Sequence, residues 1–178
     1  MSCLDSVGSA ARAIRAGDAG LMIAGGVESM SRAPMVMPKA EQAFSRETAI
    51  YDTTIGWRFV NPRMQAAFGI DSMPETAENL AALYQISRQD QDAFALQSQQ
   101  RWAAADAAGH FTDELIPVAI PQRKGDALVF GRDEHPRPHS SAADLARLKG
   151  VNGTDLTVTA ATASGVNDGP APLAIPSE

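Results

Sequence analysis

Three polar side chains that could do chemistry follow an apolar stretch and a glycine pair. Residues 21–24 are apolar, residues 25–26 are both glycine, and Glu28, Ser29 and Ser31 come next. A buried strand here would deliver polar groups to its carboxyl end, where open α/β sheets carry their sites. Glu28 could act as a general base there, but we favour the interpretation that it holds the loop through backbone hydrogen bonds.

The cysteine and histidine content limits the remaining chemistry. A single cysteine, Cys3, excludes an internal disulfide framework and a cysteine-rich zinc site. Cys3 lies near the start of a predicted helix and could be a reactive thiol, although we interpret it as incidental. His135 and His139 are four residues apart, but Pro136 and Pro138 keep them from sharing a helical face. We therefore expect no metal site.

The composition is that of a soluble globular protein and argues against two classes of partner. The chain has 178 residues, 44% hydrophobic and 20% charged, with a formal net charge of −6. An acidic protein is a poor partner for nucleic acid or an anionic membrane, so an anionic ligand would need a local basic patch. The sequence has neither a signal peptide pattern nor an apolar run of about 20 residues. We expect a cytoplasmic protein.

The elements that must position these residues include both helices and strands. The predicted helices cover residues 4–17, 74–86, 88–108 and 141–149, and the predicted strands cover 21–25, 115–121, 127–130 and 156–160. At the amino end, a helix, a short turn and a buried strand amount to half of a βαβ unit. The pattern indicates an α/β fold and a chain that begins in the middle of a domain.

Two regions have less regular patterns. In residues 34–69, large apolar side chains are spread among proline, glycine and threonine, which predicts an ordered excursion packed by those side chains. A further helix would be expected after Gly169, but Pro170, Pro172 and Pro176 interrupt it. Because a proline inside a helix costs about 3 kcal/mol, we predict an irregular end.

Six short motifs, in order and at compatible spacing, resemble the thiolase family. They are residues 24–34, 73–79, 87–95, 123–125, 133–134 and 163–169, and residues 51–62 most resemble the 3-oxoadipyl-CoA thiolases of aromatic-compound degradation. The resemblance implies a thiolase-like α/β fold with a partial N-terminal domain and an inserted loop domain. Residues 1–34 would belong to the N-terminal domain, 35–155 to the loop domain that covers CoA, and 156–178 to the return into the N-terminal domain, with the C-terminal domain absent.

Thiolase chemistry, as the resemblance implies, uses a cysteine thiolate in a Cys-x-Ser-Gly-Leu pattern. The leucine of that pattern corresponds to Leu4, so the cysteine would precede Met1, and Cys3 falls on the glycine position. The family's Asn-Glu-Ala-Phe, Gly-His-Pro and Cys-Gly-Gly motifs do not occur in the 178 residues. We therefore expect no intact catalytic residue and a chain truncated at both ends.

The resemblance carries CoA-binding roles onto five positions. Arg137 aligns with an arginine along the CoA nucleotide, where a guanidinium suits phosphate and adenine. Ala160 and Ser164 align with the pantetheine channel, where small residues leave room, and Ser72 and Met73 align with the pantetheine-side loop. The alternative for Arg137 is a solvated basic turn. The alternative for Ala160 and Ser164 is that they are small because they pack between helix and sheet. CoA would be a substrate, with no tightly bound cofactor.

One departure from the family puts a local turn in doubt. Where relatives have Gly-Asn, this chain has Ala161 and Thr162, and alanine resists a positive φ.

The implied activity is CoA-dependent cleavage of 3-oxoadipyl-CoA to succinyl-CoA and acetyl-CoA by the full-length parent. The alternatives are an acetyl-CoA C-acetyltransferase of broader specificity and a non-catalytic CoA-binding fragment. We expect no nucleic acid or membrane partner, and a homo-oligomer in the full-length parent.

Overall fold

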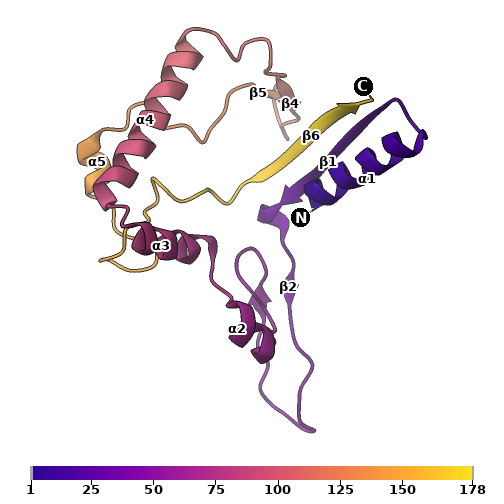
Figure 1. The fold of residues 1–178 in the computed structure, drawn as a ribbon, viewed down its shortest axis with the longest axis vertical. Helices are drawn as coiled ribbons and strands as arrows, with labels where there is room; N and C mark the ends of the chain where they lie inside the picture. The colour runs from indigo at the N-terminus through magenta and orange to yellow at the C-terminus, as the bar shows by residue number, and fades with distance from the viewer. Residues whose placement is uncertain (1, 178) are drawn as a thin grey trace. The chain divides into compact units, whose positions relative to one another are not determined.

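The computed structural model describes residues 2–177, which form two compact units (Figure 1). One unit comprises the residues up to Ile70 together with those from Val166 onward, and the second runs from Asp71 to Gly165. These bounds differ from the domain bounds that the thiolase resemblance implies, and the assignment of residues 1–34, 35–155 and 156–178 stays a prediction.

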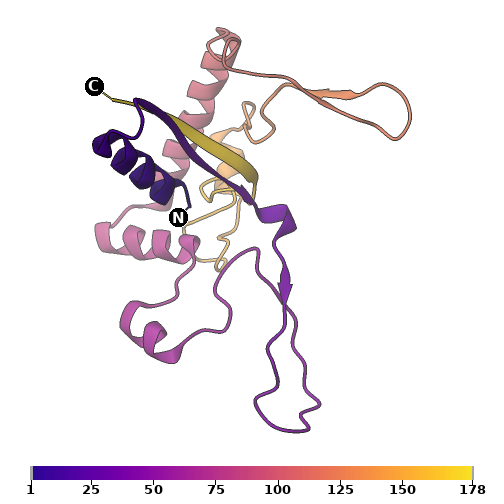
Figure 2. The same ribbon diagram turned by 90° about the vertical axis from the view of Figure 1, so that its right-hand side faces the viewer.

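The first unit is built on a helix packed against a pair of strands. Helix α1 (Ser2–Ala16) leads through a turn at Gly17, which has a φ of 83°, into strand β1 (Leu21–Ser29). Strand β6 (Asp168–Pro176) runs antiparallel beside β1 (Figure 2). Ala10 of α1 and Ala24 of β1 are only 2% and 4% exposed, which places the small core between helix and strands.

Strand β6 replaces the irregular end that we predicted after Gly169. Pro170, Pro172 and Pro176 lie opposite residues 27, 25 and 21 of β1. The Ser177 N–H donates to the Gly20 carbonyl at 2.8 Å, so the ladder bonds use the positions between the prolines. At each proline position the backbone N–H would point away from β1, so its absence removes no bond between the two strands.

Gly25 of the family-like glycine pair lies opposite one of these prolines. A Cβ at Gly25 would stand 2.9 Å from both the Ala171 carbonyl oxygen and the Pro172 Cα. The close approach of the two backbones therefore requires glycine at this position.

Residues 30–70 form an arm of short elements. They are the 3-10 turn η1 (Met30–Arg32), strands β2 (Met35–Val36) and β3 (Tyr51–Asp52), and helix α2 (Pro62–Phe68). Helix α2 was not predicted, although Asn61 caps its start by accepting from the Arg63 N–H at 2.9 Å. The expected packing by large side chains is mostly wrong, since Phe68 is 83% and Met35 65% exposed. Tyr51 and Phe59 do meet edge to face.

The second unit contains the predicted helices and hairpin. Helices α3 (Met73–Tyr84), α4 (Arg88–Ala107) and α5 (Ala142–Ala146) confirm three predictions, and each begins after a serine cap. Strands β4 (Val118–Ile120) and β5 (Leu128–Phe130) form the predicted antiparallel hairpin. Across residues 2–177, no helix is both long and apolar enough to cross a membrane.

The predicted strand at residues 156–160 is wrong. Only Thr159 pairs, through a single bridge to Gly150, and the Val158 N–H donates to the Glu78 carboxylate at 2.6 Å. A side chain thus takes the donor that a neighbouring strand would use. Val158 and Thr159 are both buried.

Candidate functional site

The candidate site is a small cavity within the second unit that brings together Arg137 and Ala160. Its volume is about 120 Å³, and its walls come from α4, the loop around Arg137 and the turn after Thr159. The lining residues are Ala95, Gln99, His135, Arg137, Ser140, Leu145, Ala160, Ala161 and Ala163. Two of the five CoA-binding positions suggested by the sequence therefore line one cavity.

Arg137 is the centre of the loop that closes this cavity. Its Nη1 donates to the carbonyls of Glu134, His135 and Pro136 at 2.6, 2.7 and 3.1 Å. Its own carbonyl accepts from the hydroxyl of Ser140 at 2.8 Å. One guanidinium nitrogen thus organises the loop, and Nε and Nη2 are the groups that could face an anion.

A second, larger cavity borders the first. It has a volume of about 590 Å³ and is lined by Ile86, Asp90, Gln91, Phe94, Ala95, Ser98, Gln99, Ala161 and Thr162. Ala95, Gln99 and Ala161 line both cavities. A ligand that extended from one to the other would pass these three residues.

The turn at Ala161 and Thr162 forms despite the departure from the family pattern. The Thr162 hydroxyl accepts from the Thr159 N–H at 2.9 Å, and the Ala163 N–H donates to the Thr159 carbonyl at 2.8 Å. Ala161 is not among the described residues with positive φ, so its methyl group causes no strain there. The doubt raised by the sequence is resolved by the Thr162 hydroxyl.

The other three predicted positions lie outside the cavity. Ser72 caps α3: its N–H donates to Glu75 Oε2 at 2.7 Å, and its hydroxyl accepts from the Glu75 N–H. The hydrogen bonds from Ser72 lower the pKa of Glu75 below its ordinary value. Met73 and Ser164 are exposed. The CoA-binding roles of all five residues stay predictions.

Sequence reasoning gave no role to the polar contacts that hold residues 157–158 to helices α3 and α4. Glu78 Oε2 accepts from the Thr157 hydroxyl at 2.8 Å, and Gln91 Nε2 donates to the same hydroxyl oxygen at 2.9 Å. Burial opposes ionisation of Glu78, but hydrogen bonds from Val158 and Thr157 outweigh it and lower its pKa. The sequence gave one indication that Glu78 matters, namely its place in the thiolase-like motif at residues 73–79.

In the first unit, two recognised motifs meet through a carboxylate. Asp168 Oδ1 accepts from the Ser31 N–H at 2.9 Å, and Asp168 Oδ2 accepts from the Ser31 hydroxyl. The Ser31 hydroxyl and then its backbone N–H lower the pKa of Asp168. Asp168 therefore holds the turn after β1, a role that the sequence suggested for Glu28 and that stays a prediction for that residue.

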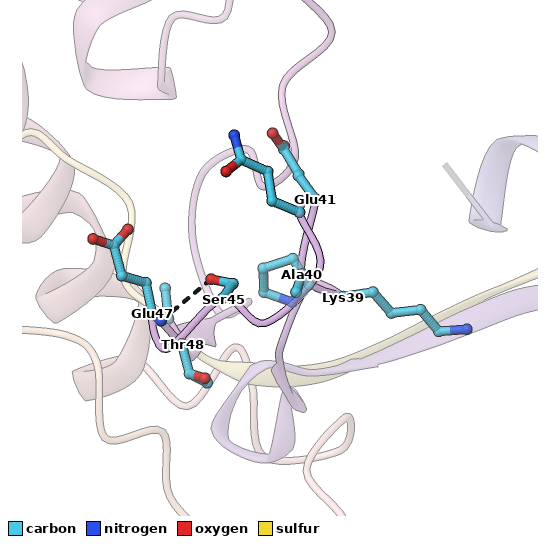
Figure 3. A pocket seen from close by; sticks show the side chains of 9 residues that line it. Lys39, Ala40, Glu41, Ser45, Glu47 and Thr48 are labelled. Carbon is cyan, nitrogen blue, oxygen red and sulfur yellow. Dashed lines mark hydrogen bonds between the residues drawn. The ribbon is translucent and has the colours of Figure 1, made fainter.

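The arm contains a third hollow, which brings no chemistry together. It has a volume of about 400 Å³ and is lined by residues between Pro38 and Ala49, all from one loop. Figure 3 shows its polar side chains spread in different directions, with only the Ser45–Glu47 bond between them. Among residues 2–177, no group of three histidine, cysteine or acidic side chains could hold a metal ion.

Comparison with known proteins gives the family. The family described as Thiolase, N-terminal domain, matches residues 1–178. The beta-ketoadipyl-CoA thiolase of Pseudomonas putida is 59% identical over 176 residues, covering 99% of this chain and 44% of the relative. The 3-oxoadipyl-CoA/3-oxo-5,6-dehydrosuberyl-CoA thiolase of Escherichia coli K12 is 57% identical over 177 residues, with the same coverage.

A solved structure supports the same conclusion. Human mitochondrial 3-ketoacyl-CoA thiolase in complex with CoA matches with a TM-score of 0.78 and 35% identity, over 99% of this chain and 42% of that one. The chain spans less than half the length of the relatives it matches. It belongs to the thiolase family and corresponds to part of a thiolase's N-terminal region.

Proposed function

We propose that the parent protein is a thiolase that cleaves 3-oxoadipyl-CoA with CoA to give succinyl-CoA and acetyl-CoA. The observation that carries this proposal is the identity of 57 to 60% with beta-ketoadipyl-CoA thiolases over 99% of the chain. We take the proposed substrate from the names of those relatives. The proposed metabolic role of the parent is the degradation of aromatic compounds.

The proposed reaction is a two-step acyl transfer. A cysteine thiolate of the parent attacks the 3-oxo carbon, the bond between C2 and C3 breaks, and acetyl-CoA leaves as an enolate that takes up a proton. The thiol of a second CoA then takes the succinyl group and frees the cysteine. These 178 residues contain no Cys-x-Ser-Gly-Leu pattern, so we assign them binding rather than the nucleophile.

In this proposal the second unit contacts CoA through the cavity at Arg137. Nη1 donates to the loop carbonyls, which leaves Nε and Nη2 for a ligand. Through these two nitrogens the guanidinium would pair with a phosphate or lie along the adenine. Ala160 would leave room for the pantetheine chain, and the exposed Ser164 hydroxyl could donate one hydrogen bond. Ser72 would act mainly by capping the start of α3, where Met73 is the first helical residue.

Calorimetry of the chain against CoA tests this binding role. Wild-type chain should bind CoA, and Arg137→Ala should weaken binding about tenfold because a charge-assisted contact is lost. Lys124→Ala, at the tip of the β4–β5 hairpin, is the matched control for loss of one positive charge. Absence of heat at millimolar CoA, or equal losses in the two variants, would reject the proposed site.

Two alternatives remain to be separated from this function. An acetyl-CoA acetyltransferase of Chromobacterium violaceum is 50% identical over 171 residues, which favours a broader acetyltransferase as the second candidate. Comparing acetoacetyl-CoA with 3-oxoadipyl-CoA as substrates of the parent distinguishes the two. The 178-residue chain alone should bind CoA without catalysing thiolysis. A non-catalytic CoA-binding protein would give the same result, so thiolysis by the parent distinguishes the two.

We further propose self-association and a cytoplasmic location for the parent. Large apolar side chains are exposed on β1, where Ile23 is 77% exposed, and at the tip of the arm. Patches of this kind are usually covered by other protein. Sedimentation of the purified parent at several concentrations would test the association.

A further inference from the structure

Gln99 connects helix α4 to the loop that carries Arg137. Its Oε1 accepts from the backbone N–H of Arg137 at 2.7 Å, across 38 residues of sequence. The Gln99 side chain is half-buried, and the residue lines both cavities. The bond therefore lies where the loop, the helix and the two cavities meet.

The loop depends on Arg137 in both directions along the chain. Upstream, Nη1 collects three carbonyls, and downstream the Arg137 carbonyl accepts from Ser140. These bonds shape the loop internally, but none of them fixes where it sits on α4. Arg132 ties the start of the loop to Asp106 of α4 at 3.0 Å. The bond from Gln99 supplies the placement at Arg137 itself.

We propose that Gln99 is a positioning residue for the Arg137 guanidinium and so for the anionic part of CoA. The inference rests on the proposed function, namely that this cavity receives CoA. What Gln99 must supply is a hydrogen-bond acceptor at the Arg137 amide. A side chain of similar size without an acceptor would leave the loop internally intact and held to α4 at Arg132, but its Arg137 end could shift along the helix.

Hydrogen exchange of the Arg137 amide tests the contact without any ligand. Gln99→Leu should reduce protection of this amide about tenfold, because one hydrogen bond to a neutral acceptor is lost. Gln99→Glu retains an acceptor and should keep the protection. Gln97→Leu, an exposed glutamine on the same helix, should change nothing. Unchanged protection in Gln99→Leu, with the helices still folded, would overturn the proposal.

CoA affinity then tests the positioning role. Gln99→Leu should weaken CoA binding about tenfold at any salt concentration, because the guanidinium is misplaced. Gln99→Glu should weaken it only at low salt, because the added charge repels the phosphates and salt screens this repulsion. A loss in Gln99→Glu that persists at high salt would reject the positioning role. If wild-type chain does not bind CoA, the proposed function fails, while the exchange of the Arg137 amide still decides whether Gln99 holds the loop.

Discussion

Asp168 in the first unit and Glu78 in the second hold loops by the same kind of contact, yet their surroundings differ. Asp168 accepts hydrogen bonds from Ser31 at one end of a strand pair in which nine residues of each strand are in register. Glu78 accepts from Thr157 and Val158, in a segment whose β pairing is the single bridge at Thr159. The β1–β6 backbone hydrogen bonds hold the first unit even without the Asp168 contact. The Glu78 contact, by contrast, takes the place of backbone pairing in its segment.

The two units also bury their apolar residues differently. In the second, Leu145 and Val158 are buried. Arg88 donates to the Leu145 carbonyl within α5 and to the Leu148 carbonyl just after it, at 2.8 and 3.0 Å. In the first, the buried side chains are alanines, while Leu21 and Ile23 on β1 stay exposed. Both units leave large apolar side chains exposed, including Phe94 in the second, but the second also buries a leucine and a valine where the first buries only alanines.

The largest effect is expected from Leu145→Ala. Leu145 is 4% exposed, so removing its side chain should cost the second unit about 3 kcal/mol of unfolding free energy. Hydrogen exchange resolved by residue should show the loss in α3, α4 and α5 but not in β1 and β6. Leu4→Ala, at an exposed leucine of α1, is the control. Equal losses in both units would mean that they do not unfold separately.

Gly25→Ala should destabilise the first unit by about 2 kcal/mol. The new Cβ would press on the backbone of Ala171 and Pro172, neither of which can move without disturbing the β1–β6 register. Gly8→Ala is the matched control, because its Cβ meets only the flexible end of Arg12 at 3.4 Å. That change should stabilise α1 slightly, since alanine favours helix over glycine. Similar melting curves for the two variants would contradict the close-approach argument.

These contrasts explain which elements the sequence could predict. Helices α3 and α4 were predictable because Ser72 and Ser87 are local caps ahead of suitable helical patterns. Strand β6 was missed because its prolines were judged only by the cost in a helix. Their spacing of two, at Pro170 and Pro172, was the signal that they share one strand edge.

The candidate site was predictable only in part. Arg137 and Ala160 were suggested by resemblance, and the structure places them in one cavity. The bond from Gln99 to Arg137 joins residues 38 apart, with no local pattern to indicate it. The prediction of a strand at 156–160 was wrong for a related reason. β-branched residues favour a strand, but they do not indicate whether a backbone N–H will donate to a neighbouring strand or, as at Val158, to the Glu78 carboxylate.

Glu78→Gln should cost the second unit about 1 to 2 kcal/mol at neutral pH. A glutamine offers one acceptor where the carboxylate offers two, so the bonds to Thr157 and Val158 cannot both be kept at full strength. The folded pKa of Glu78 lies below its ordinary value of 4.5, so its contribution is present above that value and is lost as the pH falls through the folded pKa. Denaturant titrations between pH 7 and pH 3 should therefore show a shallower acid loss in the variant. Parallel pH profiles for variant and wild type would contradict the role of Glu78.

Asp168→Asn should have the smallest effect, and its size decides whether the comparison of the two carboxylates is correct. The folded pKa of Asp168 is also lowered by its bonds from Ser31, so its contribution likewise disappears as the pH falls through that pKa. However, the β1–β6 ladder remains when the side-chain bonds are lost, and an exposed hydrogen bond competes with water. Exchange at the Ser31 amide should therefore accelerate in the variant, while exchange along β1 stays unchanged. If the whole of β1 opened instead, Asp168 would be as necessary to its unit as Glu78 is to the other, and the backbone ladder would not be what distinguishes the two contacts.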